Sequence, residues 1–239
     1  MYLFVSDLHL SAEQPRITGL FLEFLNEQAA GAEGLYILGD LFEAWLGDDV
    51  VLPEYEPVLQ ALSDLTASGV PVWVQRGNRD FLLGEEFARR TGCRLLDDAQ
   101  VVQLPDGPAL LMHGDTLCTD DIPYQKMRQQ LRDPAWIAAF LEKTPAERVA
   151  FARDLRERSQ RETGEKAETI MDVNAGAVAE AMQGHGVRRL IHGHTHRLHH
   201  HHITLDGTPA ERIVLGDWGE AGSAVVCDDA GCRLTTIGG

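Results

Sequence analysis

The sequence predicts an α/β (α+β) fold in which two sheets pack face to face, with helices on their outer faces and one helical insertion. Three observations lead to this prediction. Short apolar runs alternate with helical patterns through the first half of the chain, the segment 121–170 is helical throughout, and the C-terminal part is rich in strands.

The first half of the chain alternates predicted strands and helices. Four runs bounded by Gly, Pro or Asp predict buried strands at 2–5, 35–38, 70–75 and 109–112. Apolar side chains recur at helical spacing in the intervals, at Phe21, Leu22, Leu25 and Ala29 and again at Val58, Leu59, Leu62 and Leu65. Gly69 is suited to end the second of these helices. This alternation is typical of an α/β core.

The segment 121–170 is predicted to be an insertion of three helices. Asp133-Pro134 and Thr144-Pro145 are typical helix starts, because a capping side chain precedes proline in each, and Glu147 completes a capping box. The segment holds 10 of the 21 basic residues and 9 of the 37 acidic ones, so its charge is +1 against −17 for the rest. We expect this insertion to have a role of its own.

The C-terminal part is predicted to be almost entirely β. Strands are expected at 189–191, 203–205, 212–215, 224–227 and 234–237, with turn residues between them. The run His199–His202 lies between strands, where alternate histidines would face solvent, and no catalytic role is expected for it.

Length, charge and cysteine content limit the possible functions. A chain of 239 residues suits one domain, 1–239, and its net charge of −16 argues against a nucleic-acid partner. No apolar run reaches the ~20 residues that span a membrane, and the N-terminus lacks a signal peptide's basic lead, so a cytoplasmic protein is expected. Four irregularly spaced cysteines predict reduced thiols, with a reversible Cys227–Cys232 disulfide across a hairpin turn as the alternative.

Five short segments place metal-binding types of side chain directly after predicted strands. They are Asp7-Leu8-His9, Gly39-Asp40, Gly77-Asn78-Arg79-Asp80, His113-Gly114-Asp115 and His194-Thr195-His196. The carboxyl ends of strands in an α/β sheet are where ligand sites gather. Imidazoles, carboxylates and an amide oxygen together form the mixed set that two divalent cations sharing a carboxylate need.

Each segment alone is explained more simply as a turn, since Asp, Asn and Gly are common turn formers. Five of them in series, each closing a strand, are much harder to explain in that way. They indicate a two-metal hydrolytic site in which water, and no serine or cysteine, is the attacking group.

The five segments resemble the signature of the calcineurin-like metallophosphoesterases, D-x-H, G-D, G-N-H-[DE], H and G-H-x-H, over residues 7–196. The resemblance implies that family's four-layer αββα sandwich. One position departs from it, because Arg79 follows Gly77-Asn78 where the general family has His. The stretches 4–10, 39–49, 113–121, 170–174 and 190–197 are similar to one branch, the hydrolases of UDP-2,3-diacylglucosamine in lipid A biosynthesis.

The resemblance also implies roles for individual residues. Asp7, His9, Asp40 and His196 would hold one cation, and Asp40, Asn78, His113 and His194 the other, with Asp40 bridging two ions that are typically Mn²⁺. Substrate contacts would fall on Asn78, Arg79, Asp121, Ser159, Thr163, Lys166 and His194, and Asn78, Arg79 and His194 would be catalytic. Thr163 is the weakest match, because the neighbouring Gly164 and Glu165 depart from the family pattern.

The implied reaction is attack by water on the α-phosphorus of UDP-2,3-diacylglucosamine, which yields UMP and 2,3-diacylglucosamine 1-phosphate. Arg79 suits a phosphate leaving group, because a guanidinium stabilises negative charge without titrating. The simpler alternative is a structural ion pair between Arg79 and Asp80.

The insertion offers what a long acyl substrate would need. Trp136, Ile137, Phe140 and Leu141 share one helical face, and five arginines follow at 148, 153, 156, 158 and 161. Apolar surface for acyl chains and cationic surface for phosphates would hold the protein peripherally on the cytoplasmic side of the inner membrane. The alternative is an ordinary helix packed on the core with solvated arginines.

Two other functions fit the same residues. A soluble nucleotide or dinucleotide pyrophosphohydrolase of the same superfamily would keep the site and change the substrate, and a metal-binding scaffold would bind ions without turnover. A repair-type nuclease is disfavoured by the acidic composition, since neutralising the phosphate backbone dominates nucleic-acid affinity.

Overall fold

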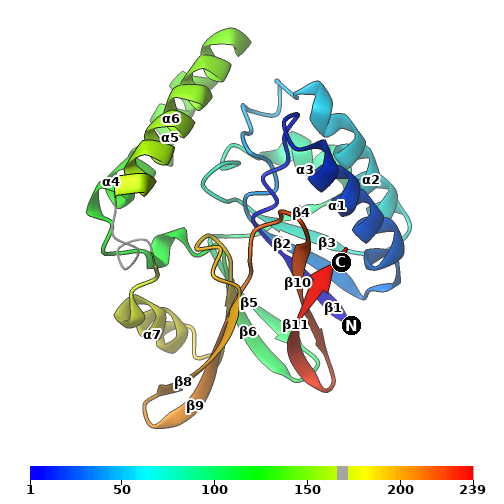
Figure 1. The fold of residues 1–239 in the computed structure, drawn as a ribbon, viewed down its shortest axis with the longest axis vertical. Coiled ribbons are helices and arrows are strands. Elements are labelled where there is room, and N and C mark those ends of the chain that lie inside the picture. The colour runs from blue at the N-terminus through cyan, green and yellow to red at the C-terminus, as the bar shows by residue number, and fades with distance from the viewer. Residues whose placement is uncertain (166–171, 239) are drawn as a thin grey trace.

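The computed structural model describes residues 1–165 and 172–238, with side chains described in 1–158 and 172–238. These residues form two β-sheets (Figure 1). The first has the order β11 (Gly231–Ile237), β10 (Gly222–Asp228), β1 (Tyr2–Val5), β2 (Gly34–Leu38), β3 (Val72–Gln75) and β4 (Arg94–Leu95). The second has the order β5 (Ala99–Leu104), β6 (Gly107–Met112), β7 (Arg189–His192), β9 (Thr208–Val214) and β8 (His199–Leu205).

Both sheets combine parallel and antiparallel strands. Strands β1 to β4 run parallel, as do β6, β7 and β9, whereas β10 and β11 and the edge strands β5 and β8 run antiparallel to their neighbours. The five predicted metal-binding segments follow β1, β2, β3, β6 and β7 directly. The parallel strands therefore deliver all five segments to one end of the molecule.

Helices cover the outer faces of both sheets, which confirms the predicted sandwich. Helices α1 (Pro15–Glu27), α2 (Glu56–Ala67) and α3 (Glu85–Thr91) lie beside the first sheet, and α7 (Ala175–Gly184) lies beside the second (Figure 1). Between the sheets lies a cluster of buried side chains from both, including Phe4, Tyr36, Leu111, Ile191 and Ile213. Short 3₁₀ turns occur at Ala29–Gly31, Pro53–Tyr55 and Asp115–Leu117.

The predicted insertion contains three helices, α4 (Ile122–Leu131), α5 (Pro134–Leu141) and α6 (Pro145–Glu165), which stand apart from α1 to α3 in Figure 1. Both expected caps are present. Asp133 accepts hydrogen bonds from the backbone N–H groups of Ala135 and Trp136, and Thr144 and Glu147 bond reciprocally. Part of the apolar face turns inward, because Phe140 is buried and stacks on Trp136, and both contact Phe151 of α6, whereas Leu141 stays exposed.

The structure departs from the sequence-based predictions in several places. Helices α3 and α7 and strands β4 and β5 were not expected, and β8 begins at His199, so the histidine run belongs to a strand. The expectation of reduced thiols is wrong for Cys227 and Cys232, which form a disulfide because the hairpin register places them directly opposite each other. Among the described helices, none is both long and apolar enough to cross a bilayer.

Candidate metal centre

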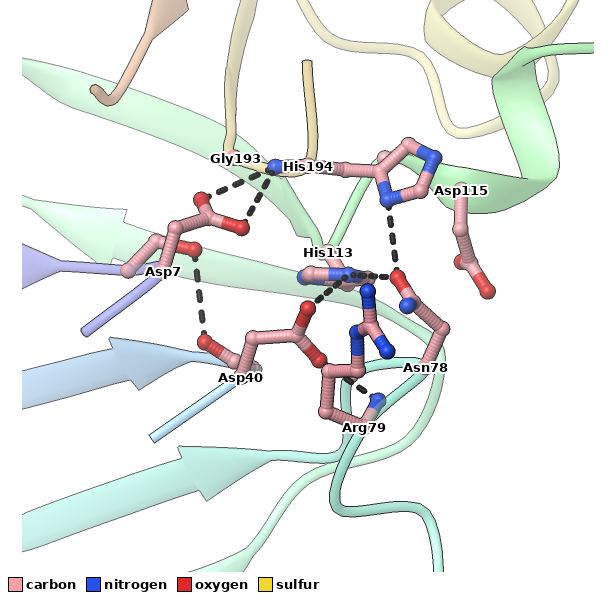
Figure 2. Close-up of polar contacts among 12 residues, drawn as sticks. Asp7, Asp40, Asn78, Arg79, His113, Asp115, Gly193 and His194 are labelled. Carbon is pink, nitrogen blue, oxygen red and sulfur yellow. Dashed lines mark hydrogen bonds and ion pairs between the residues drawn. The ribbon is translucent and has the colours of Figure 1, made fainter. Parts of the chain in front are cut away.

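The seven predicted ligands meet where the five strands end; five of the residues in this cluster, Asp7, Asp40, Asn78, His113 and His194, are labelled in Figure 2. Their backbone is unusual. Asp7, His9, Asp40, His194 and His196 all have positive φ angles, between 49° and 69°. Among the other described non-glycine residues, Asp206 alone shares this conformation. Left-handed backbone is costly for such side chains and is retained where function requires it, so its concentration here points to a functional site.

Asp7, His9 and His196 form one side of the cluster. The Nε2 atom of His196 lies 3.3 Å from His9 Nε2 and 3.3 Å from Asp7 Oδ1. Asp7 is fully buried and accepts a hydrogen bond of 2.9 Å from the backbone N–H of His194. Burial alone would raise the pKa of Asp7, but the hydrogen bond with His196 and the neighbouring histidines hold it below its usual range. Asp7 is therefore a carboxylate near neutral pH.

Asn78, His113 and His194 form the other side. The amide oxygen of Asn78 lies 3.0 Å from His113 Nε2 and 2.9 Å from His194 Nδ1 (Figure 2). His113 Nδ1 donates to the carbonyl oxygen of Leu38 at 2.8 Å, which directs Nε2 into the site. Burial, reinforced by the charge of His113, lowers the pKa of His194 to about 4. The ring of His194 is therefore neutral at pH 7 and able to bind a cation.

Asp40 lies between these two sides. Its Oδ2 atom is 3.8 Å from His9 Nε2 and 3.8 Å from His113 Nε2. Its Oδ1 atom accepts the backbone N–H of Arg79 at 2.8 Å. A Cβ atom at Gly77 would come within 2.0 Å of Oδ1, so only glycine permits this close approach. One carboxylate oxygen is thus presented to both sides at once.

The donor atoms fit divalent cations. Ligand atoms lie within 4.8 Å of one another in each of two sets, Asp7–His9–His196 and Asp7–Asp40–His113. Burial disfavours a charged His9, yet Glu43, Asp40 and Asp7 raise its pKa to about 9. The cluster therefore retains a proton that a metal ion would displace. Nitrogen and oxygen donors grouped beside carboxylates in this way are typical of a metal centre.

Two acidic residues to which the sequence analysis gave no role support the site, Glu43 directly behind a ligand and Asp115, from the segment after β6, through helix α4. Glu43 Oε2 lies 3.1 Å from His9 Nδ1, so that Nε2 points into the site, and its Oε1 lies 3.8 Å from Arg79 Nη1 and 3.1 Å from Arg156 Nε on α6. Asp115 accepts from Arg128 Nε at 2.6 Å and from the Tyr124 hydroxyl at 3.1 Å, both on α4. Asp115 stands in one of the five segments singled out from the sequence, whereas Glu43 has no such signal of its own.

Asp80 is a third supporting carboxylate, and the acidic position of the G-N-x-[DE] pattern signals it. It is fully buried and accepts the backbone N–H groups of Leu41 at 2.8 Å and Gly77 at 2.7 Å. Burial, together with the nearby charge of Asp40, raises the pKa of Asp80 to about 6. Asp80 therefore links the loops that follow β2 and β3. The ion pair of the Arg79 side chain is with Glu43 and not with its neighbour Asp80.

The predicted substrate residues divide into described and undescribed ones. Asn78, Arg79, Asp121 and His194 all line one cavity. Asp121 also caps α4 by accepting the backbone N–H of Tyr124 at 3.2 Å. Lys166 and the side chains of Ser159 and Thr163 lie outside the described residues, so their roles stay predictions.

The cavity has a volume of about 700 Å³ and is lined by the metal-binding segments and by the insertion. The metal-binding segments supply polar side chains, His9, Asp40, Asn78, Arg79, His194 and His196. The insertion supplies apolar side chains, Met127, Leu131, Trp136, Phe151 and Leu155, together with the polar Asp121, Tyr124, Gln130, Asp154 and Arg158. An adjoining apolar pocket shares Asn78, Arg79 and Phe151 and adds Trp45, Phe81 and Phe140. The space can therefore hold a molecule with a charged end and a long apolar end.

Comparison with known proteins places these features in a family. Residues 2–198 match the calcineurin-like phosphoesterase family. A UDP-2,3-diacylglucosamine hydrolase of Stenotrophomonas maltophilia (strain K279a) is 53% identical over 242 residues, covering 98% of this chain and 98% of the relative. Hydrolases of the same name from Marinobacter nauticus and Pseudomonas aeruginosa (strain UCBPP-PA14) are 51% and 49% identical, covering 91% and 97% of this chain and 89% and 96% of theirs.

The family match covers most of the chain, and its ligand types are those that meet at the sheet ends. This chain is a metal-binding hydrolase that belongs to the calcineurin-like phosphoesterases, in the branch whose members are named UDP-2,3-diacylglucosamine hydrolases.

Proposed function

We propose that this hydrolase cleaves the pyrophosphate of UDP-2,3-diacylglucosamine by attack of water on the α-phosphorus, giving UMP and 2,3-diacylglucosamine 1-phosphate in lipid A biosynthesis. The observation that carries the proposal is a cavity that joins the metal-ligating groups to a cluster of five apolar side chains from the insertion. A soluble nucleotide would cover only part of this apolar surface with its base, whereas two acyl chains would cover much more of it.

The proposed centre holds two divalent cations, taken to be Mn²⁺. Asp7, His9, Asp40 and His196 would bind one, and Asp40, Asn78, His113 and His194 the other. When bound, such ions supply Lewis-acid activation of water and compensate the charge of phosphoryl oxygens. Asp40 suits the bridging role because Oδ2 is equidistant from His9 and His113.

The chain's own residues orient the substrate and stabilise charge. The proposed catalytic groups are Asn78, Arg79 and His194, which all line the cavity. Arg79 is held beside the centre by Glu43, where its guanidinium faces the phosphates as negative charge develops on the leaving group. A phosphate leaves as an anion, so a group that stays charged serves better there than one that gives up a proton.

The insertion, residues 121–170, is proposed to act as the substrate cap within a single domain, 1–239. Its helices supply the apolar side chains of the cavity, and Asp121 places a carboxylate where sugar hydroxyls could donate to it. Ser159, Thr163 and Lys166 would complete the contacts to the head group, alongside Asn78, Arg79, Asp121 and His194.

A labelling experiment tests the reaction. Metal-stripped protein is reloaded with one metal at a time and given UDP-2,3-diacylglucosamine in water enriched in heavy oxygen. We expect Mn²⁺ to restore turnover and the label to appear in UMP. Label in the lipid phosphate would overturn attack at the α-phosphorus. Turnover of diadenosine polyphosphate but not of the lipid would favour a soluble pyrophosphohydrolase, and metal uptake without turnover of either would favour a scaffold.

We also propose that the cap contacts the cytoplasmic face of the inner membrane, where a diacylated substrate resides. Two large apolar side chains of the insertion remain exposed, Ile122 at 55% and Leu141 at 37%. Changing both to Glu should lower co-sedimentation with anionic phospholipid vesicles several-fold, whereas Leu198→Glu, on an exposed residue outside the cap, should not. Equal binding by all three proteins would contradict the contact.

A further inference from the structure

Strand β8 carries four consecutive histidines that the metal centre does not use. Side chains alternate across a strand, so His199 and His201 lie on one face and His200 and His202 on the other. Both pairs are close, with ring centroids 4.4 Å apart for His199 and His201 and 4.8 Å apart for His200 and His202. The chain thus contains two His-x-His pairs on one strand, back to back.

The register of the neighbouring strand shows which way each pair faces. His200 is opposite Ile213, which belongs to the core between the sheets, so His200 and His202 lie on the face turned toward the first sheet. His201 is opposite Arg212, and on that face Leu205 packs with Met182 of α7. The two pairs therefore differ in surroundings while sharing residue type, strand and spacing.

The charges next to the two pairs have opposite sign. Glu211 is opposite His202 in the register, and its Oε2 lies 2.6 Å from His200 Nε2. Its other oxygen accepts from Arg189, which is itself paired with Asp106, so this face keeps a surplus of negative charge. On the other face Arg212 lies beside His201 and disfavours a second positive charge there, while Asp172 is paired with Arg197.

The contact with Glu211 also prepares His200 for a metal. A carboxylate only accepts hydrogen bonds, so His200 Nε2 donates and Nδ1 keeps its lone pair. An imidazole held in this way by a carboxylate is the usual arrangement around protein-bound metal ions, where the outer carboxylate fixes the tautomer and raises the basicity of the ligand.

We propose that His200 and His202, oriented by Glu211, form a second cation site selective for late first-row ions such as Ni²⁺, Cu²⁺ or Zn²⁺. Imidazole pairs favour these ions over Mn²⁺ and Mg²⁺, which prefer oxygen ligands. Two histidines and water complete the coordination, so this site binds more weakly than the cage at the sheet ends.

The pair His199 and His201, on the other face of β8, gives a matched control. The untagged full-length protein is kept in excess Mn²⁺ to fill the first centre, and bound Ni²⁺ is measured by equilibrium dialysis and elemental analysis. We expect the wild type to bind one Ni²⁺ beyond any that exchanges into the first centre, and His200→Ala/His202→Ala to bind this additional ion at least about tenfold more weakly. His199→Ala/His201→Ala, which removes the same groups from the other face, should stay within about threefold of wild type.

Glu211→Gln supplies the second measurement. It keeps both imidazoles and removes the orienting charge, so Ni²⁺ affinity should fall about tenfold. Hydrolytic activity and circular dichroism spectra should match wild type in all variants and exclude misfolding. Unchanged Ni²⁺ binding in His200→Ala/His202→Ala, or an equal loss in His199→Ala/His201→Ala, would overturn the proposal.

Discussion

The metal centre and the cap are held in place in different ways. At the centre, ligands follow the ends of strands, three of the seven (Asp7, Asp40 and His113) are buried, and backbone groups hold them, as the bond from Arg79 N–H to Asp40 shows. The cap is joined to that edge through long side chains: Arg128 to Asp115, Arg148 to Asp49 and Arg156 to Glu43. Under the proposed function, chemistry would reside on the rigid edge and substrate selection on helices attached by these ion pairs and by the packing of Phe140 against the core.

This contrast makes a general prediction about kinetics. Changes at the rigid edge should act on kcat, because they alter the charges that meet the reacting phosphate. Changes at the attachments of the cap should act on KM for the acylated substrate and spare small substrates that do not reach the cap.

The largest effect is expected for Asp40→Asn. The amide cannot offer a charged oxygen to both sides of the centre, so kcat should fall by at least ~10³-fold, or ~4 kcal/mol in barrier. Bound metal per chain, measured by elemental analysis, should also fall. Asp64→Asn, the same change on the exposed face of α2, should alter neither quantity. Full metal content and near-normal turnover in Asp40→Asn would exclude the bridging role.

Arg79→Lys should have the next largest effect. The variant keeps the positive charge but loses the planar fork, and kcat on the pyrophosphate substrate should fall ~10²-fold. The backbone N–H that holds Asp40 is untouched, so metal content should not change. The Arg79→His variant introduces the residue of the general family, and its kcat should fall by a similar factor. A loss of no more than about threefold for either variant, a barrier change below ~1 kcal/mol, would reject the charge-stabilising role.

The same contrast explains what the sequence could predict. Asp7, His9, Asp40, Asn78, His113, His194 and His196 were identifiable because each sits in a short motif directly after an apolar strand, and both signals are local. The five positive φ angles are not local in this sense, since only the assembled loops impose them.

The supporting contacts could not be predicted, because they join residues far apart in the chain. Glu43 meets Arg156, and Asp49 meets Arg148, across about a hundred positions. Strand β5 was missed because two glutamines interrupt its apolar run, as suits an edge strand. The inward turn of Trp136 and Phe140 depended on packing with Phe151 of a later helix.

Arg148→Met should have a smaller, different effect. The guanidinium is 3% exposed and bonds to Asp49 at 2.6 Å and to the carbonyl oxygen of Leu46 at 3.0 Å, so its loss leaves a buried acceptor unpaired. That costs about 1–3 kcal/mol and loosens the cap. KM for the diacylated substrate should rise about tenfold, with kcat on an aryl phosphate within about threefold. Arg153→Met, at an exposed position of α6, is the control, and an equal rise in KM there would contradict specific anchoring.

The smallest effect is expected from changing Asp49, the carboxylate that pairs with Arg148. Asp49 is 62% exposed, so solvent screens its ion pair with Arg148, and Asp49→Asn should weaken attachment of the cap by less than ~1 kcal/mol. The hydrogen bond from Arg148 lowers the pKa of Asp49 in the folded protein. Its contribution is therefore complete above the unfolded value of about 3.9 and is lost as the pH falls through the lowered folded value. Hydrogen exchange of α5 and α6 amides should be slower in wild type than in Asp49→Asn at neutral pH and equal in acid. A difference that persists at the lowest pH would assign the stabilisation to a group other than this carboxylate.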